Sequence, residues 1–525
     1  ESKLNLNRSD TNRTISLVSS INDIKIKEYE IGDVEINTFG NTDFDSYSIN
    51  LKLSDKDKTP IYSEGTIIAI NENSNIDLDI IIDNFDISFI NKIGNNSIND
   101  LSSQISGRVN LWGDLNKLQH DGSLNLNNSN FSIPYTNINY QIAENSKIIL
   151  YNQDFEFNDI IINHNESKTT SKLSGKISHI NYKDWNLDLS FESDRFFVLN
   201  KLYNEKEVFF GKGFLGGIIN INGPTNQIGI NVQGKTEKGT ELSIPRSEEF
   251  SIENFSFIDF IDINNIKESK VGEENLNSTI IPKTLDLLID LEINDNALVD
   301  ITLDPQTGSY LSGRGIGNLI MEIDSESEFN IYGDYITSEG IYNFKDLALV
   351  DKKFNLQKGG TIVWDGDPLE AQMNIQALYS VPGGANPALL LDNPNFNKKI
   401  PTDVQINLTG NITKPDSPNF QIYFPNTSTT ATTEINYKLS DIEVRQLQAI
   451  SLLTQGIFIN EVGVSIEGLT NNIYEKVSDV FTSLLGGSEG PLKVGLNYLQ
   501  GDKSDILDIK TEDRFGVTLS TKISD

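Results

Sequence analysis

Apolar and polar residues alternate strictly in many short segments of the chain. In residues 284–293, TLDLLIDLEI, the odd positions from Leu285 to Ile293 are apolar, and the even positions between them hold Asp or Glu, except for Leu288. Successive side chains of an extended strand point to opposite faces, so this period of two predicts a β-strand with one apolar and one wet face. Such a strand needs a cover for its apolar face.

The same alternation recurs along most of the chain. It is present in residues 75–83, 186–193 and 403–410, and Gly, Asn, Asp and Pro provide turn signals between such segments. Helical periodicity is nearly absent before residue 440. We therefore predict a mainly β fold. The apolar faces of these strands are predicted to contain Ile76, Leu78, Ile80, Leu187, Leu189, Phe191, Leu285, Leu287, Ile289, Leu291, Ile293, Leu319, Met321, Ile323, Phe329, Ile331, Val404, Ile406, Leu408, Phe420, Ile422 and Phe424.

Three segments share a loose repeat. GRVNLWG (107–113), GIININGP (217–224) and VQINLTG (404–410) are each followed by a strand pattern that ends in a proline, in FSIP, LSIP and NFQIYFP. Loose repeats of this kind indicate stacked rungs of one elongated structure instead of separate globules. With strands about 4.8 Å apart, the stack is predicted to be on the order of 100 Å long.

Residues 440–486 break the β pattern. SDIE (440–443) has the form of a capping box, and apolar residues follow at helical spacing until Gly456, which predicts one helix. A second helix is predicted from about Asn471 to Leu485. The two helices either cap the last rung of the β stack or serve a membrane surface or a partner.

The expected domain organisation follows from these patterns. An elongated β unit is predicted over residues 1–430, a helical segment over 431–490, and further strands over 491–525. In the last unit, two alternating segments resemble strands of an outer-membrane barrel. Their apolar faces are candidates for binding a partner and consist of Leu492, Val494, Leu496 and Tyr498, then Phe515, Val517 and Leu519.

Composition and charge exclude several classes of function. The chain has 525 residues, 42 Lys and Arg against 75 Asp and Glu, and a net charge of −33. So acidic a protein is poorly suited to nucleic acid or to an anionic membrane surface. The absence of cysteine rules out disulfides and thiolate metal sites. Without a signal peptide or a long apolar stretch, the sequence is expected to be a soluble piece of a longer protein.

Two matches to catalytic motifs fail on context. Residues 211–216 spell G-x-G-x-x-G, but the following IININ continues as a strand, whereas a dinucleotide site needs a helix there. Residues 486–490 spell G-x-S-x-G, but the serine follows a predicted helix and no histidine is near in sequence. We therefore predict no catalytic residue and no enzyme activity.

Metal and cofactor sites are not expected either. His120, His164 and His179 lack the spacing of metal ligands, and we expect them at the surface. Asp365 and Asp367 form a close acidic pair, but such pairs are frequent among 75 carboxylates. The prediction is a protein without metal and without cofactor.

One long region resembles a known family. Residues 304–344 and 354–379 are similar to the C-terminal domain of the TamB family of diderm bacteria, AsmA-like relatives of bridge-type lipid carriers. The similarity covers about residues 105–525 and is weaker before them. The matching features are Gly313, Gly315 and Gly317 before an alternating strand, the turn with Gly340, Tyr342 and Phe344, and the strand from Gly359-Gly360 to Trp364 that ends in Gly366-Asp367-Pro368.

The resemblance implies a fold and a cover for the apolar face. Members of the family fold a long sheet into a U-shaped trough, a β-taco, whose apolar face lines a groove for lipid. The alternation alone is equally compatible with the packed core of a solenoid. The resemblance also implies a periplasmic location, phospholipid as cargo, an inner-membrane anchor outside this fragment, and an Omp85-type barrel, TamA-like or BamA-like, as partner.

Three functions remain open at this point. The first is a conduit for phospholipids between the inner and outer membranes. The second is an assembly factor that helps to insert outer-membrane β-barrel proteins, a role that the resemblance also implies. The third is a β-solenoid adhesin or polysaccharide enzyme, which would need a carboxylate or aromatic cluster on an exposed sheet face.

Overall fold

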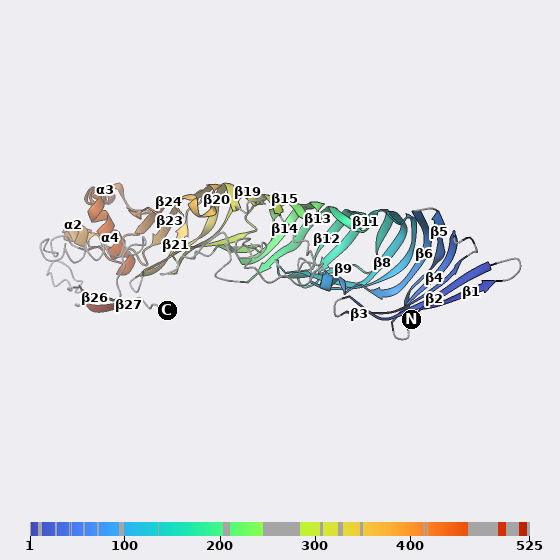
Figure 1. Ribbon diagram of the computed structural model, residues 1–525. Coiled ribbons are helices and arrows are strands. Elements are labelled where there is room, and N and C mark those ends of the chain that lie inside the picture. The colour runs from blue at the N-terminus through green and yellow to red at the C-terminus, as the bar shows by residue number, and fades with distance from the viewer. Residues whose placement is uncertain are drawn as a thin grey trace, which may run out of the picture.

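Most of the chain forms one long, curved β-sheet (Figure 1). The computed structural model describes residues 2–459, 492–499 and 514–521, apart from residues 9–12, 27–28, 41–42, 44, 56–57, 71–72, 94–98, 135, 203–209, 245–283, 305–307, 324–328, 347–349, 413–414 and 417. Twenty-five strands belong to the long sheet, and two further strands pair with each other.

The N-terminal third is a meander in which each strand is antiparallel to the next. A short hairpin turn is enough to connect two antiparallel neighbours, because the second strand starts where the first one ends. A single helical turn, α1 (Ile90–Ile93), lies between β6 and β7. The strands are β1 (Ser2–Arg8), β2 (Arg13–Ile26), β3 (Tyr29–Gly40), β4 (Ser46–Asp55), β5 (Lys58–Ile70), β6 (Asn73–Asp86), β7 (Asn99–Asp114) and β8 (Lys117–Ile133).

The meander continues through the middle of the chain. Two shorter strands, β9 and β10, share one position, because both pair with β8 and with β11. The same holds for β15 and β16, which both pair with β14. The strands are β9 (Ile138–Ile142), β10 (Ser146–Asn152), β11 (Asp154–His164), β12 (Thr169–Ile180), β13 (Lys183–Lys201), β14 (Phe210–Pro224), β15 (Gln227–Thr236) and β16 (Glu241–Ile244).

A parallel step follows, after which the sheet is antiparallel to its end. β17 is parallel to β15, and β18 is parallel to β16. Parallel neighbours require a crossover connection, and residues 245–283, which connect them, lie outside the described residues. The strands are β17 (Thr284–Ile293), β18 (Leu298–Asp304), β19 (Ser309–Ile323), β20 (Phe329–Asp346), β21 (Val350–Leu356), β22 (Thr361–Gly366), β23 (Gln372–Ser380), β24 (Asp403–Asn411) and β25 (Asn419–Tyr423).

The predicted elongated, mainly β fold is confirmed. Four pairs of strands share a position, namely β9 with β10, β15 with β16, β17 with β18, and β21 with β22. The 25 strands of the sheet therefore occupy 21 positions. At about 4.8 Å per position the sheet is about 100 Å long, as the repeat indicated.

Bulges bend the long strands and curve the sheet. In β6 the register with β7 shifts beside Asn84, whose φ is 49°, and in β11 the register with β12 shifts beside Asp159, whose φ is 51°. Asn and Asp tolerate this left-handed backbone better than most residues. Their N–H groups donate to Ser106 Oγ (2.9 Å) and Ser174 Oγ (3.2 Å) on the neighbouring strands. A bulged strand bends, so these two bulges are consistent with the predicted U-shaped β-taco.

Helices gather at the C-terminal end of the sheet, where Figure 1 shows α2, α3 and α4. The predicted helix before Gly456 is confirmed as α4. The second predicted helix, residues 471–485, lies outside the described residues. Sequence patterns did not predict α3, TTATTEINYK, because it has no apolar stripe. The bounds are η3 (Pro368–Glu370), α2 (Ala388–Leu391), η4 (Pro394–Phe396), α3 (Thr429–Lys438) and α4 (Ile442–Thr454).

The N-terminus of α4 differs from the predicted capping box in detail. Asp441, not Ser440, is the N-cap, and its carboxylate accepts from the N–H groups of Glu443 (2.9 Å) and Val444 (3.2 Å). The hydroxyl of Ser440 instead donates to the carbonyl oxygen of Tyr437 at 2.6 Å, at the end of α3. Among the described helices, none has the length and apolar character needed to cross a bilayer.

Candidate functional site

The apolar residues of successive strands lie on one continuous face, here called the inner face. Residues directly opposite each other on paired strands share a face of the sheet. Cross-strand pairs of apolar residues therefore trace the inner face from β6 to β25. They include Ile80–Val109, Leu124–Ile148, Ile148–Phe157, Phe155–Ile177, Ile177–Leu187, Leu189–Ile221, Ile221–Ile230, Ile230–Leu287, Leu287–Ile323, Ile323–Phe329, Tyr335–Ile362, Ile362–Met373, Ile375–Leu408 and Ile406–Phe420.

The described candidates for the apolar face fall on this inner face. In β17 the register pairs Leu287, Ile289 and Leu291 with the inner-face residues of β19. Leu288, the exception in the pattern, is on the opposite face, where it is 40% exposed and faces Glu322. Leu285 belongs to β17 by its backbone, but its side chain is outside the described part.

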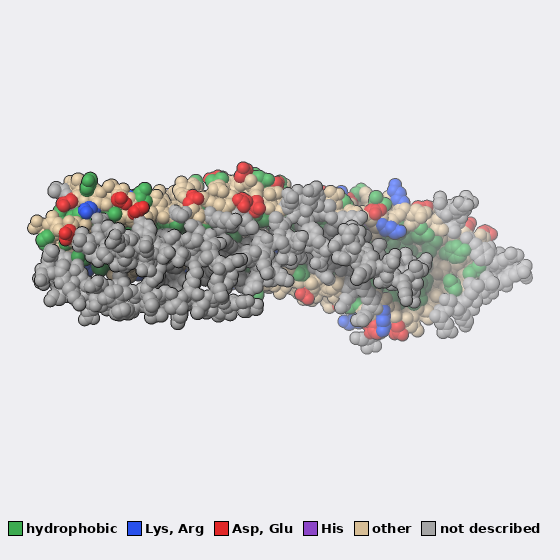
Figure 2. Space-filling model, turned by 60° about the vertical axis from the view of Figure 1, so that its left-hand side comes forward, with side chains coloured by type: hydrophobic (Ala, Val, Ile, Leu, Met, Phe, Trp, Pro, Cys, Tyr) green, Lys and Arg blue, Asp and Glu red, His purple; other side chains and the backbone are tan. Residues whose placement is uncertain are grey.

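The opposite, outer face is polar and acidic. Asp286, Asp290 and Glu292 of β17 are exposed there, and in β6 Asp79 pairs with Arg108 of β7 at 3.1 Å. Figure 2 shows acidic side chains spread over the surface and apolar side chains gathered in a hollow towards the N-terminal half. The two faces of the sheet therefore differ as the alternation predicted.

Burial of the inner face changes along the sheet. In β13 and β17, Leu187, Leu189 and Ile289 are half-buried. Near the C-terminal end the same face is closed, and Val404 and Ile406 of β24 are 0% exposed. The inner face is thus partly accessible in the middle of the molecule and fully covered at its C-terminal end.

Helix α4 belongs to this closed end. Its residues Ala449, Leu452 and Leu453 are buried in one apolar cluster with inner-face residues of β23 and β24. The guanidinium group of Arg445 donates from Nε to the carbonyl oxygen of Phe420 in β25 at 3.0 Å. α4 therefore packs against the last strands of the sheet, and its predicted role as a cap of the last rung stays a prediction.

The expectation that the histidines are surface residues was wrong. His120, His164 and His179 are 0%, 8% and 3% exposed. His120 and His179 occupy inner-face positions of their strands, because each is an even number of residues from an inner-face residue. They lie at the edge of the sheet where the β7–β8 and β12–β13 hairpins turn. Their Nε2 atoms are 3.0 Å apart and they pack against Phe155 and Trp185. With a separation of 59 positions, the sequence gives no signal of this contact.

Hydrogen bonds fix the protonation of this pair. The N–H of Tyr182 donates to His179 Nδ1 at 3.0 Å, so His179 carries its proton on Nε2 and donates it to His120 Nε2. His120 then carries its proton on Nδ1, a buried atom without a hydrogen-bond partner. Burial, with the nearby His179, lowers the pKa of His120 to about 4, and burial also lowers the pKa of His179. The pair is neutral at pH 7.

The same contact reveals the curvature of the sheet. His120 is in β8 and His179 is in β12, three strand positions away, which corresponds to about 14 Å in a flat sheet. Their ring nitrogens nevertheless approach to 3.0 Å. Asn181 also reaches across, since its Oδ1 accepts from the N–H of Leu118 at 2.9 Å. The sheet is therefore tightly curled at this edge.

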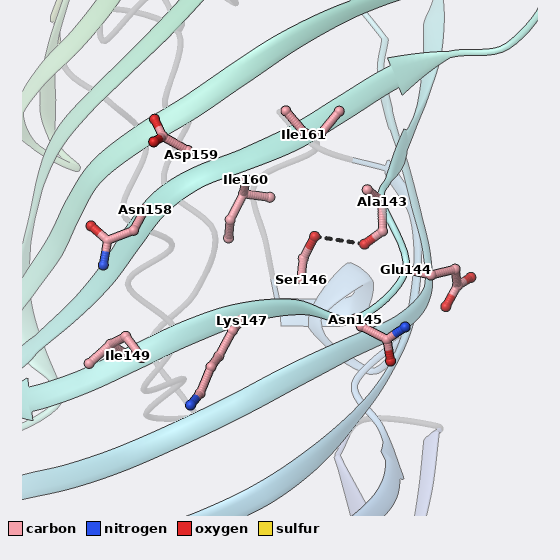
Figure 3. A pocket seen from close by; sticks show the side chains of 10 residues that line it. All are labelled: Ala143, Glu144, Asn145, Ser146, Lys147, Ile149, Asn158, Asp159, Ile160 and Ile161. Atoms are coloured by element: carbon pink, nitrogen blue, oxygen red, sulfur yellow. Dashed lines mark hydrogen bonds between the residues drawn. The ribbon is translucent and has the colours of Figure 1, made fainter.

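A shallow pocket of about 420 Å³ lies where β9 ends and β10 begins. Figure 3 shows its lining, which comes from the turn at 143–147 and from the bulge of β11. Its hydroxyl group, Ser146 Oγ, donates to the carbonyl oxygen of Ala143 at 2.6 Å. The lining holds no imidazole that would activate this serine, so the pocket lacks the parts of a nucleophilic site.

The metal ligands and the two catalytic motifs that the sequence analysis considered can be compared with the described residues. Among the described residues, no cluster of three or more His, Asp or Glu side chains is placed to hold a metal ion. The G-x-G-x-x-G match lies within β14, a strand as predicted, and residues 486–490 lie outside the described part.

The candidate partner-binding residues lie on a separate pair of strands, β26 (Leu492–Leu499) and β27 (Arg514–Thr521). The two strands are antiparallel and place the candidate residues opposite one another. The pairs are Val494–Leu519, Leu496–Val517 and Tyr498–Phe515. Whether these residues bind a partner stays a prediction, as does the lining of a lipid path by the inner face.

Comparison with known proteins gives one family. Residues 158–525 match the family model of the TamB C-terminal domain. The match covers more than two thirds of the chain and includes the strands from within β11 onward. A search of curated proteins found no match to the chain.

Proposed function

The chain belongs to the TamB C-terminal domain family, and on that premise we propose that it carries phospholipids between the inner and outer membranes along its apolar inner face. Membership of the family supports a role in the cell envelope. The proposal places the chain in the periplasm of a diderm bacterium. It assigns no catalytic step, metal or cofactor.

The continuity of the inner face carries this proposal. Apolar residues are opposite apolar residues through successive strand pairs, as in Ile177–Leu187 and Ile230–Leu287. An acyl chain on this face would meet aliphatic side chains of similar character at every strand. In the middle of the sheet these side chains, such as Leu187 and Ile289, are only half-buried, which supports a face that receives an additional apolar occupant.

The energy of lipid transfer explains what such a face contributes. Moving a phospholipid with two sixteen-carbon chains into water costs about 0.8 kcal/mol per methylene, or about 25 kcal/mol in total. An apolar path replaces this single barrier with small steps between similar sites. The charged head group stays in water along the open side of the trough, as polar groups avoid apolar surroundings.

Transfer between vesicles tests the proposal. The purified chain is added to donor vesicles that contain a self-quenched fluorescent phospholipid and to unlabelled acceptor vesicles. We expect the rate of dequenching to rise in proportion to the protein concentration. An equal concentration of an acidic protein without an apolar face serves as control, and equal rates for both proteins would reject the conduit.

The isolated strand pair supports the second function, an assembly factor for outer-membrane barrels. Each of β26 and β27 has one edge that pairs with no described strand. A two-stranded sheet is marginally stable alone, and an exposed edge can add a strand of another protein. On this proposal, β26 and β27 dock on an Omp85-type barrel, TamA-like or BamA-like.

Site-specific photo-crosslinking tests this docking. Photoreactive residues at Asn497 and Thr518, which follow the wet positions of the two strands, are introduced one at a time in cells. We expect adducts with an outer-membrane barrel protein. A matched position on the outer face of the long sheet, Asp290, should give none of these adducts. Adducts with inner-membrane proteins alone would exclude the docking.

A further inference from the structure

Helix α4 lies across the inner face at the C-terminal end of the sheet. It contacts β25, β24 and β21. β21 and β25 are three strand positions apart, because β23 and β24 lie between them, and this corresponds to about 14 Å along the sheet. A helix of 13 residues is about 20 Å long, enough to bridge that span.

The apolar side of α4 fills the space above these strands. Ala449, Leu452 and Leu453 are at most 2% exposed, and Ile375 of β23 and Ile406 of β24, on the inner face, are at most 1% exposed. All five belong to one cluster. At this end, the chain's own aliphatic side chains therefore occupy the surface that the proposed function assigns to acyl chains.

A few polar contacts join α4 to the segment after it and to β25. The amide of Gln448 forms two hydrogen bonds with the backbone of Ile459, at 2.8 and 2.9 Å. The hydroxyl of Ser451 donates to the carbonyl oxygen of Ile457 at 2.8 Å. Arg445 donates to the carbonyl oxygens of Phe420 in β25 and of Leu439, each at 3.0 Å. Each involves a side chain of α4 and a backbone group outside it.

We propose that α4 is an autoinhibitory plug of the lipid path. The proposal rests on the proposed function and adds a regulation of the same site. In the structure described here, α4 contacts β25 and β24 and also β21, and on this proposal it stops lipid on the upstream strands from reaching the C-terminal end. Passage requires α4 to leave the inner face, with its buried leucines exchanging places with acyl chains.

A photoreactive lipid shows which strands of the unaltered chain are in contact with lipid. The purified chain is incubated with vesicles of phosphatidylethanolamine and phosphatidylglycerol that contain a phospholipid with a diazirine in one acyl chain. After irradiation, mass spectrometry locates the adducts. We expect adducts on β13 and β17, at residues such as Leu187 and Ile289, and none on β23, β24 or β25.

A variant without the polar contacts should open the end of the path. Arg445→Ala, Gln448→Ala and Ser451→Ala together remove the bonds from α4 to its surroundings and leave its apolar side unchanged. The control combines Thr432→Ala and Thr454→Ala, whose hydroxyls bond carbonyl oxygens within α3 and α4 or at their ends. Adducts on β23 to β25 should appear in the triple variant and stay absent in the control.

The outcomes separate the plug from the conduit. Adducts on β23 to β25 of the unaltered chain, at the level of those on β13 and β17, would overturn the plug and leave the conduit standing. Their absence in a triple variant that keeps its circular dichroism spectrum would also overturn the plug. No adduct on any strand would reject the conduit and the plug together. If the triple variant loses its β-sheet circular dichroism spectrum, the adducts on the unaltered chain decide between the outcomes.

Discussion

Arginine at Ile289 distinguishes an accessible groove from a closed core. Ile289 is half-buried on the inner face of β17, opposite Met321 of β19. The adjacent Leu288 is 40% exposed on the outer face and opposite Glu322. Ile289→Arg and Leu288→Arg thus place the same charge in the same strand, one residue apart, on opposite faces.

The structure sets the expected loss of stability. Full burial of an isoleucine side chain contributes about 1.5–3 kcal/mol, so Ile289→Arg should lower the free energy of unfolding by about 1–2 kcal/mol. Its guanidinium group can extend to the open side of the trough, which avoids the larger cost of a buried charge. Leu288→Arg should change stability by less than about 0.5 kcal/mol.

A third variant marks the closed end of the same face. Ile406 of β24 is 0% exposed and belongs to the same apolar cluster as the buried residues of α4. Ile406→Arg would bury an unpaired charge, so we expect a loss of more than about 4 kcal/mol. In urea titrations, Leu288→Arg should therefore be the most stable of the three variants, Ile289→Arg the next, and Ile406→Arg the least stable.

Lipid transfer supplies the functional readout. A charge in the path should raise the barrier for a passing acyl chain by about 2–3 kcal/mol, which slows transfer by about one hundredfold. The vesicle assay compares the Ile289→Arg and Leu288→Arg proteins under conditions where both are folded. Equal transfer rates for the two folded variants would refute the placement of a lipid path at β17. A fully unfolded Ile289→Arg protein would instead indicate a closed core there.

Three further predictions concern stability. His120 has a pKa of about 4 in the fold against about 6.5 when unfolded, so its contribution to the free energy of unfolding is fully present above pH 6.5 and falls by about 3 kcal/mol towards pH 4; urea titrations of His120→Phe should show a weaker fall, and an unchanged one would contradict the assignment. Asp441→Ala should cost about 1 kcal/mol as the loss of an N-cap, more than Ser440→Ala; the reverse order would restore the predicted capping box. Gly65→Ala should sharply lower the thermal midpoint, because a Cβ there meets the backbone of β6, whereas Gly229→Ala has room and should not; equal midpoints would contradict this packing.

Alternation in the sequence was sufficient to assign the faces of the strands. The two faces of the sheet meet different surroundings, so a period of two identifies the inner residues, and Leu288 falls on the outer face as its break in the pattern implies. The bulges at Asn84 and Asp159 were not predictable in the same way. An Asx residue within a strand pattern also fits an ordinary wet position, and its left-handed φ depends on the neighbouring strand.

Contacts between distant strands were also beyond the sequence. Helical periodicity located α4, but its position across the inner face depends on how the sheet brings β21 and β25 within reach. The His120–His179 contact likewise requires the curl of the sheet between β8 and β12. Isolated polar residues look like surface residues in a sequence, because burial of a polar group depends on a partner that only the fold supplies.

The lipid content of the purified chain tests the central claim most directly. The chain is purified from the cell envelope, transferred to detergent-free buffer, extracted with organic solvent and analysed by mass spectrometry, with the Ile289→Arg and Leu288→Arg proteins treated alike. The account predicts phospholipid in at least equimolar amount with the unaltered and Leu288→Arg proteins, and clearly less with Ile289→Arg. A folded, unaltered chain without phospholipid, also after incubation with vesicles, would contradict it.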